Sequence, residues 1–439
     1  LETAGAKIGP KEIRMMLKWP RVVGLGEVMN YPGVLAGDRR LGLMIRETMR
    51  ARKVVEGHAP GLVGKELNGY LSTGIAGDHE STTELELVDK LRLGCVVEIR
   101  EGSTSHDLPT LIRALKSHKL STRRTLLVSD DRHAQDLVKL GHMDYNVRTA
   151  IEMGLDPIDA IMMATLNTAE HFRVDTEIGG IAPGKRADIV LTPDLSSMKI
   201  DTVIADGRAV AKGGTLVAKV VSPRFPRRAL RTVHLKRTVG PRDFVVRSGT
   251  EVGVARVVVV DASGEILTKK AYADLPIRNY QIKPSTEGDI LKIAVIERHK
   301  RTGNIGRGFV RGFGLNAGAI SSSVAHDSHN ICVVGTNDSD MAVAVNEIAR
   351  LQGALVAVKE GRVLAELALP LAGLMSTQAI EEVNLAETRI SEAAQSLGCT
   401  LASPFMVMSF LSLAVIPEVR LTDKGLVDVS SAQFIPITC

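Results

Sequence analysis

Four carboxylate or imidazole side chains each follow a short apolar run within the first 130 residues. Glu27 follows RVVGLG, His58 follows KVVEG, His79 follows GIAGD, and Asp130 follows TLLVS. Neutral imidazole and carboxylate are ligands that divalent transition metals accept, and a mixed set with open positions is typical of hydrolytic sites rather than closed structural ones. These residues therefore predict a metal site assembled from four separate segments.

The runs that precede these residues have the length of buried parallel strands, and helical stretches separate them, as in βαβ units. Five strands are predicted, at residues 21–26, 52–57, 73–77, 94–99 and 124–129. In a (β/α)8 barrel of the TIM type, catalytic groups lie at the C-terminal ends of several strands, so side chains distant in sequence converge. We therefore expect an α/β fold that contains the C-terminal strands of such a barrel. Five strands do not close it, and we expect the first three βα units to lie upstream or on another chain.

The pattern along the chain predicts four regions. Residues 1–174 form the C-terminal part of the barrel, ending in helices at 144–153 and 157–172; Asp156 caps the second helix. Residues 175–222 carry Gly-containing turns between short strands and predict a small β unit. A Pro- and Arg-rich linker follows at 223–241. Residues 242–439 predict an α+β domain; its elements are strands at 251–260, 289–296 and 330–335, helices at 338–352 and 378–397, and a hairpin at Glu360 and Gly361.

Composition excludes several classes of protein. The net charge is +5, but aromatic residues are only 3% of the 439, so no stacking platform accompanies the basic residues and nucleic-acid binding is not expected. The four cysteines are scattered without a C-x-x-C pair, which favours a reducing, cytoplasmic setting. Residues 393–417 are uncharged, but Pro404 and several hydroxyl side chains interrupt them, so we expect a buried helix or a subunit contact of a homodimer rather than a membrane span.

Six motifs, in this order, resemble those of one enzyme family. They are GLGEVMNYPGV, EGHAPGL, GDHES, IREGS, SDDRHAQDL and GGIAPGKRADIVL. Together they are similar to the adenine deaminase branch of the amidohydrolase superfamily, and the resemblance continues through RGFGLNAGAISSSVAHDSHN into the helix-rich tail. The resemblance implies a metal-dependent barrel, a β unit beside it, a C-terminal domain peculiar to the branch, and hydrolytic deamination of adenine to hypoxanthine and ammonia.

The family's metal ligands transfer to matching positions. By resemblance, Glu27 bridges two divalent metal ions from barrel strand four, His58 and His79 are imidazole ligands from strands five and six, and Asp130 lies at the end of strand eight. Mn²⁺ or Fe²⁺ is expected, with Zn²⁺ as the alternative, because His and carboxylate sites accept all three. The family also uses an H-x-H pair on strand one, and no H-x-H occurs in this sequence. We therefore expect weak metal binding and slow turnover from these 439 residues alone.

The chemistry asks for proton transfer as well as metal binding. A metal ion can make water a strong nucleophile at neutral pH by lowering its pKa toward about 7. Asp130 is then expected to take the proton of the attacking water and pass it to the leaving nitrogen, while Glu101 protonates the purine ring. Further residues are predicted to contact the adenine: Arg100, Ser129, Asp131 and, from a loop closing over the barrel mouth, His326.

Structural interpretations of the same residues stay open. Glu27 could pair with Arg21 or Arg148 at the barrel mouth. Asp130 or Asp131 could cap a helix that starts near residue 133. The H-D-S-H segment that contains His326 could be a turn stabilised by an aspartate rather than a substrate loop.

Two alternative functions also stay open. Another amidohydrolase that opens a cyclic amide would use the same metals, but those enzymes commonly carry a carboxylated Lys as the metal bridge, and Glu27 occupies that position here. A non-catalytic fragment, or one part of a split enzyme, is the second alternative. An H-x-H strand encoded upstream or on a companion chain would favour catalysis.

Overall fold

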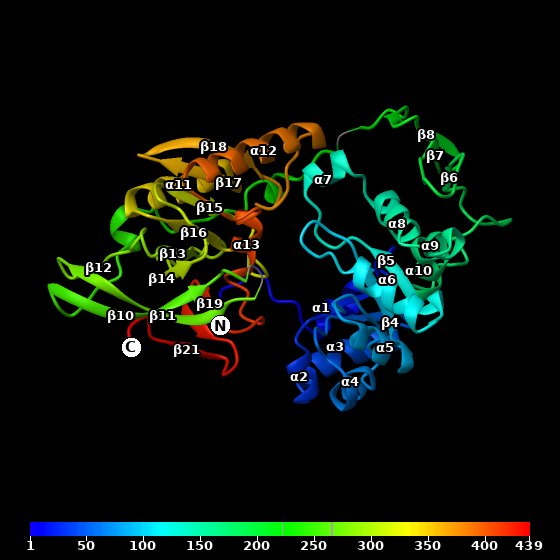
Figure 1. Ribbon diagram of the computed structural model, residues 1–439, viewed down its shortest axis with the longest axis horizontal. Helices are drawn as coiled ribbons and strands as arrows, with labels where there is room; N and C mark the ends of the chain where they lie inside the picture. The colour runs from blue at the N-terminus through cyan, green and yellow to red at the C-terminus, as the bar shows by residue number, and fades with distance from the viewer. Residues whose placement is uncertain (222, 265–266) are drawn as a thin grey trace. The chain divides into compact units, whose positions relative to one another are not determined.

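The computed structural model describes residues 1–221, 223–264 and 267–439, which form two compact units (Figure 1). One unit is Ile8–Ser222, and the other combines Leu1–Lys7 with Pro223–Cys439. Each unit has its own sheets and its own buried apolar clusters. The two are therefore described separately.

A five-stranded parallel sheet forms the centre of Ile8–Ser222, with its strands paired in sequence order. The strands are β1 (Gly24–Val28), β2 (Val54–Gly57), β3 (Gly77–Asp78), β4 (Val96–Arg100) and β5 (Thr125–Val128). Parallel strands need crossover connections, which are helical here, and the resulting burial on both faces explains the Val- and Leu-rich runs. The predicted α/β class is confirmed, and each of the five predicted strands overlaps a strand of this sheet, the third by one residue only.

Among the described residues of this unit, one α-helix precedes these strands and nine connect or follow them. They are α1 (Pro10–Met16), α2 (Tyr31–Leu35), α3 (Arg39–Arg50), α4 (Gly64–Leu71), α5 (Glu84–Arg92), α6 (Leu108–Ser117), α7 (Ala134–Lys139), α8 (Met143–Glu152), α9 (Pro157–Ala164) and α10 (Leu166–His171). In α6, Leu108, Leu111, Ile112 and Leu115 form one apolar face and are at most 2% exposed. Burying each such side chain stabilises the fold by about 1.5–3 kcal/mol.

Two predicted elements differ from the structure. The strand predicted at 73–77 is only the two-residue β3, because Gly74, with a φ of +104°, still belongs to the turn that ends α4. The helix predicted at 157–172 is divided into α9 and α10 at Thr165, whose φ and ψ of −132° and −85° are not helical. The Thr165 hydroxyl donates to the Ile161 carbonyl at 2.6 Å, a local bond of the kind that often bends helices. Asp156 caps α9 as predicted, accepting from the backbone N–H of Ile158.

A small antiparallel sheet completes this unit. Its strands pair in the order β6 (Ile189–Leu191), β7 (Thr202–Ala205), β8 (Arg208–Lys212) and β9 (Thr215–Leu216). Asp206 and Gly207, both with positive φ, form the turn between β7 and β8. The β content that the sequence predicted for this region is therefore present.

The unit that contains Pro223–Cys439 is built on a nine-stranded mixed sheet. A separate three-stranded sheet is formed by strands that come later in the sequence. The larger sheet has the order β12-β11-β10-β14-β13-β16-β15-β17-β18. Its strands are β10 (Val252–Asp261), β11 (Lys269–Arg278), β12 (Gln281–Ile282), β13 (Leu291–Ile296), β14 (Ile305–Arg311), β15 (Ala319–Ser322), β16 (Ile331–Gly335), β17 (Ala354–Lys359) and β18 (Arg362–Ala368). The smaller sheet contains β19 (Val419–Thr422), β20 (Gly425–Asp428) and β21 (Gln433–Ile435). The predicted hairpin is confirmed, with Glu360 and Gly361 at φ values of +51° and +74°.

Helices cover both faces of the larger sheet. Neighbouring residues of a strand point to opposite faces, and Ala319 packs in the cluster with α11 (Asp338–Leu351), whereas Ile320 packs in the cluster with α12 (Ile380–Ser396) and α13 (Pro404–Phe410). Val333 and Val334 of β16 alternate in the same way. The unit is therefore an α+β domain with one helix on one face and two on the other.

The uncharged segment 393–417 packs its large apolar side chains at 397–413 against this domain's own core. Leu397, Phe405, Met408 and Leu411 belong to the apolar cluster under β16 and β17. The prediction of a buried helix is confirmed, and the same burial removes the sequence's reason for placing a subunit contact there. Among the described residues, no helix is both long and apolar enough to cross a membrane.

Candidate metal centre

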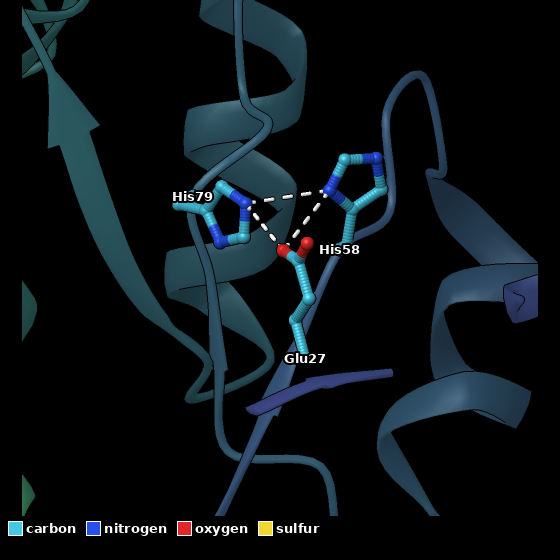
Figure 2. Close-up of side chains that lie close together, drawn as sticks. All are labelled: Glu27, His58 and His79. Atoms are coloured by element: carbon cyan, nitrogen blue, oxygen red, sulfur yellow. Dashed lines mark hydrogen bonds and ion pairs between the residues drawn. The ribbon is translucent and has the colours of Figure 1, made fainter. Parts of the chain in front are cut away.

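The side chains of Glu27, His58 and His79 converge at one edge of the parallel sheet (Figure 2). Glu27 lies near the end of β1, His58 directly follows β2, and His79 directly follows β3. Glu27 Oε2 is 2.7 Å from His79 Nε2 and 3.2 Å from His58 Nδ1, and the two imidazole nitrogens are 3.3 Å apart. Adjacent parallel strands thus bring three potential ligand atoms to one point, as the sequence pattern indicates.

The electrostatics of these three residues fit a divalent cation. Burial disfavours the charged form of Glu27, but hydrogen bonds with His58 and His79 hold the pKa of this carboxyl well below its usual range. Burial also opposes charge on His79, yet its hydrogen bond to Glu27 and the charge of that carboxylate raise the pKa of His79 to about 9. An ionised carboxylate between two imidazole nitrogens is a donor set that Mn, Fe or Zn accepts, with the metal taking the place of the shared proton.

Asp130 lies beside this group. It follows β5 with a φ of +57°, a left-handed conformation that is uncommon outside glycine and that Asp tolerates better than most residues. One of its carboxylate oxygens lies within 4.8 Å of donor atoms of His79 and Glu80. These three residues form a group of potential ligands that shares His79 with the group of Figure 2. The structure therefore places Asp130 next to His79, one of the three residues of Figure 2.

Arg100, the last residue of β4, is held by three carboxylates. Its side chain is 7% exposed, and it pairs with Glu80, with Asp107 at 2.8 Å and with Asp130 at 2.9 Å. Burial disfavours the charge, but these carboxylates raise the pKa of Arg100. The guanidinium predicted to contact substrate is thus already engaged in orienting the acidic residues around His79.

Glu80 is the residue of this site that sequence reasoning missed. Its carboxylate lies 3.5 Å from His58 Nδ1 and 3.6 Å from His79 Nε2, in addition to its pairing with Arg100. Burial raises the pKa of Glu80, and the opposing charge of Arg100 only partly offsets this effect. The signal was available, because Glu80 directly follows His79 in GDHES.

The other predicted catalytic and substrate residues have separate surroundings. Glu101 Oε1 bonds His106 Nδ1 at 2.8 Å, and Glu101 is outside the donor groups around His79 that the described residues form. Ser129 Oγ bonds His142 Nε2 at 3.0 Å, and the Asp131 backbone N–H donates to Asp130 Oδ1 at 2.7 Å. His326 lies in the other unit, where its backbone N–H donates to the Ser409 carbonyl at 2.8 Å.

The structural interpretations of two residues are resolved by their partners. Among the ion pairs of the described residues, Glu27 pairs with His58 and His79 and with neither Arg21 nor Arg148. The N-cap of helix α7 is His133, so neither Asp130 nor Asp131 holds the capping position. Both interpretations are therefore wrong for the conformation described.

A second buried group contains Glu56 on β2, Glu98 on β4 and His171 on α10. His171 Nε2 lies 2.5 Å from Glu56 Oε1, and the His171 side chain is 6% exposed. Burial and the neighbouring charge of Glu56 raise the pKa of Glu98. Gly77 lies between the two glutamates, and a Cβ there would be 2.0 Å from Glu56 Oε2, so a larger residue at this position of β3 would displace the Glu56 carboxylate.

Comparisons with known proteins agree with this architecture. Residues 15–210 match the amidohydrolase family, and residues 265–433 match the adenine deaminase C-terminal domain. Curated proteins named adenine deaminase are 44% identical in Moorella thermoacetica and in Dehalococcoides mccartyi strain ATCC BAA-2266, and 40% identical in Clostridium botulinum strain ATCC 19397. Each alignment covers 99% of this chain and 73–75% of the relative, so the chain spans about three quarters of their length.

Proposed function

The chain belongs to the adenine deaminase branch of the amidohydrolase family, and on this premise we propose that it hydrolyses adenine to hypoxanthine and ammonia. The observation that carries the proposal is the convergence of Glu27, His58 and His79, whose donor atoms lie within 4.8 Å of one another. Water supplies the oxygen that replaces the amino group on C6. The products place the enzyme in purine salvage.

Amidohydrolases use a divalent metal, and we assign its ligands to Glu27, His58 and His79, with Asp130 beside them. Glu27, between the two imidazoles, is proposed to bridge two ions. Mn²⁺ or Fe²⁺ suits these ligands, and Zn²⁺ is the alternative. We further propose that β1–β5 are strands of a (β/α)8 barrel, which would explain why the donors lie at the carboxyl ends of the strands.

The proton transfers are assigned to carboxylates around His79. When bound by Glu27, His58 and His79, a divalent metal would supply Lewis acidity, which would make water a stronger nucleophile at neutral pH. As the C6–O bond forms, Asp130 accepts a proton from the attacking water, and it returns this proton to the amino nitrogen as the C6–N bond breaks. Arg100 fixes the orientation of Asp130 through the ion pair at 2.9 Å.

The ring nitrogen must gain a proton while C6 is tetrahedral. Glu101 is the residue that the sequence suggested for this step, but Glu80 lies within 3.6 Å of both imidazole donors, whereas Glu101 bonds His106. We therefore assign the ring proton to Glu80, which regains a proton from the C6 hydroxyl as the carbonyl forms. The contacts of Ser129, Asp131 and His326 with adenine, and a homodimeric assembly, remain predictions.

Ammonia release from adenine tests the proposal. The purified protein is assayed as isolated, after chelation, and after refilling with Mn²⁺. We expect activity to disappear on chelation and to return with Mn²⁺, and Glu27→Gln to abolish it, whereas Glu66→Gln, an exposed glutamate on α4, leaves it unchanged. A fully active Glu27→Gln variant would contradict the assignment. Hydrolysis of a cyclic amide such as a hydantoin, without ammonia release from adenine, would favour the alternative reaction.

A further inference from the structure

We propose that a buried polar network of Tyr70, Asp78 and Lys90 positions Glu27 and the two imidazoles and thereby sets the affinity of the metal centre. The inference rests on the proposed metal site. None of the three network residues was singled out by sequence reasoning. Each acts on backbone atoms next to the donor residues rather than on the donor side chains.

Tyr70 joins the first two donor segments through one oxygen. It lies on α4 and is fully buried. Its hydroxyl donates to the carbonyl of Val28 at 2.8 Å and accepts from the backbone N–H of His58 at 3.1 Å. Val28 directly follows Glu27, so this hydroxyl fixes the separation between the end of β1 and the start of the loop after β2.

The ion pair of Asp78 and Lys90 joins the second and third donor segments. Their side chains are 1% and 0% exposed, and Lys90 Nζ is 2.8 Å from Asp78 Oδ2. Asp78 Oδ1 accepts from the backbone N–H of Ala59 at 2.7 Å, and Lys90 donates to the Ala59 carbonyl at 3.0 Å. Ala59 directly follows His58, and Asp78 directly precedes His79.

The same pair also holds the loop after β3. Asp78 Oδ2 accepts from the backbone N–H of Glu80 at 3.2 Å, and Lys90 donates to Ser81 Oγ at 3.0 Å. The backbone on both sides of His79 is thus held by one buried ion pair. With Tyr70, the network reaches a residue adjacent to each of the three donors.

A contribution to stability alone is a weak explanation for these residues. A buried ion pair can often be replaced by apolar residues without loss of stability, because both charges must leave water. Partners outside the ligand set, by contrast, orient metal ligands, and losing them typically weakens metal binding about 10- to 100-fold. The arrangement of the network around the ligand backbone fits the second role.

Two variants test the inference, with Co²⁺ as the probe. Tyr70→Phe removes only the hydroxyl, and Asp78→Asn combined with Lys90→Met removes both charges of the pair. Glu86, 3.6 Å from Lys90 Nζ, keeps its hydrogen bonds from Gly61 and Thr83 in that variant. We expect each to bind Co²⁺ about 10- to 100-fold more weakly and to change the visible d–d absorption of bound Co²⁺. Fluorescence of Trp19, the sole tryptophan, reports whether Ile8–Ser222 is folded.

The matched control is a Lys–Asp pair in the other unit whose lysine is buried and whose aspartate side chain is 18% exposed. Lys292 is 3% exposed and lies 2.5 Å from Asp338, so Lys292→Met with Asp338→Asn removes the same chemistry away from the donors. Wild-type Co²⁺ affinity in this control is expected. An equal loss there would overturn the inference, because the effect would then be general.

Glu27→Gln, measured in parallel, separates this inference from the metal site itself. If Glu27→Gln loses Co²⁺ while the network variants bind it with wild-type affinity and spectrum, the positioning role is wrong and the site stands. If Glu27→Gln binds Co²⁺ as the wild type does, the site is wrong and the inference falls with it. Tyr70→Phe decides the outcome should the double variant not fold.

Discussion

At the scale of single residues, the site is a set of carboxylates in different electrostatic states. Hydrogen bonds with two imidazoles keep Glu27 ionised, whereas burial raises the pKa of Glu80 one position after His79. Arg100 holds Glu80 and Asp130 together at the edge of the donor group. Carboxylates in such contrasting surroundings are suited to contrasting tasks, one as a ligand and others in proton transfer.

Replacing Glu80 and Glu101 separately by glutamine shows which of them protonates the ring. Glu80→Gln should lower kcat for adenine by about 100-fold or more, the usual contribution of a general acid, because the amide cannot give up a proton in its place. Glu101→Gln should lower kcat less than about fivefold, a change of about 1 kcal/mol in the barrier. Steady-state kinetics with Mn²⁺-loaded protein measure both. A larger loss in the Glu101 variant would return the role to that residue.

At the scale of elements, the sequence predicts well what depends on local pattern. The apolar runs located all five parallel strands, and the side chains at their ends include the three that converge, because parallel strands bring their carboxyl ends to one edge. Asp156 and the Glu360–Gly361 hairpin follow rules that span only a few residues.

Two kinds of feature could not be predicted: pairings between elements that are distant in sequence, and the direction in which an individual side chain makes its hydrogen bond. The pairing of Lys90 with Asp78, or of His171 with Glu56, requires knowing which strands and helices meet. The break at Thr165 depends on one hydroxyl–carbonyl bond that the apolar periodicity does not encode. Glu101 lies at a strand end like Arg100, but its carboxylate is hydrogen-bonded to His106. The apolar pattern of a strand does not predict in which direction the side chain at its end points.

The cluster of Glu56, Glu98 and His171 links β2, β4 and α10 and predicts a pH dependence of stability. Burial and the charge of Glu56 raise the pKa of Glu98 above its ordinary value of 4.5. The folded state therefore binds this proton more tightly than the unfolded state does. The stabilisation is fully present below about pH 4.5 and is lost as pH rises through the raised pKa.

We expect Glu98→Gln, which mimics the protonated acid, to remove this loss. In metal-free protein, the free energy of unfolding should fall by about 1–3 kcal/mol less between pH 5 and pH 8 in the variant than in the wild type. Urea unfolding followed by Trp19 fluorescence measures the free energy of unfolding of Ile8–Ser222. Equal slopes in both proteins would show that Glu98 is ionised in the fold.

At the scale of the whole molecule, the proposed chemistry lies in one of the two units. The five residues assigned to the site all belong to Ile8–Ser222: Glu27, His58, His79, Arg100 and Asp130. The nine-stranded sheet and the three apolar clusters that its described residues form belong to the other unit. A ligand that binds only the folded state stabilises it by about 2.7 kcal/mol at one hundred times its Kd. Metal binding should therefore stabilise the unit that contains the parallel sheet.

Hydrogen exchange followed by mass spectrometry shows which region of the chain metal binding stabilises. On adding Mn²⁺, we expect slower exchange in peptides that cover β1, β2, β3 and the loops that follow them, and unchanged exchange in β10–β18. Chelation should reverse this protection, and the Glu27→Gln variant should show no protection when Mn²⁺ is added. Protection confined to residues 223–439 would be incompatible with the proposed site.

The proposed metal site is tested most directly by anomalous X-ray diffraction at the Mn absorption edge from crystals grown with Mn²⁺. We expect an anomalous peak about 2.0–2.3 Å from the nearest oxygen of Glu27 and from the facing nitrogens of His58 and His79, the usual range for such ligands. A peak bound by other residues, with these three side chains still hydrogen-bonded to one another, would contradict it.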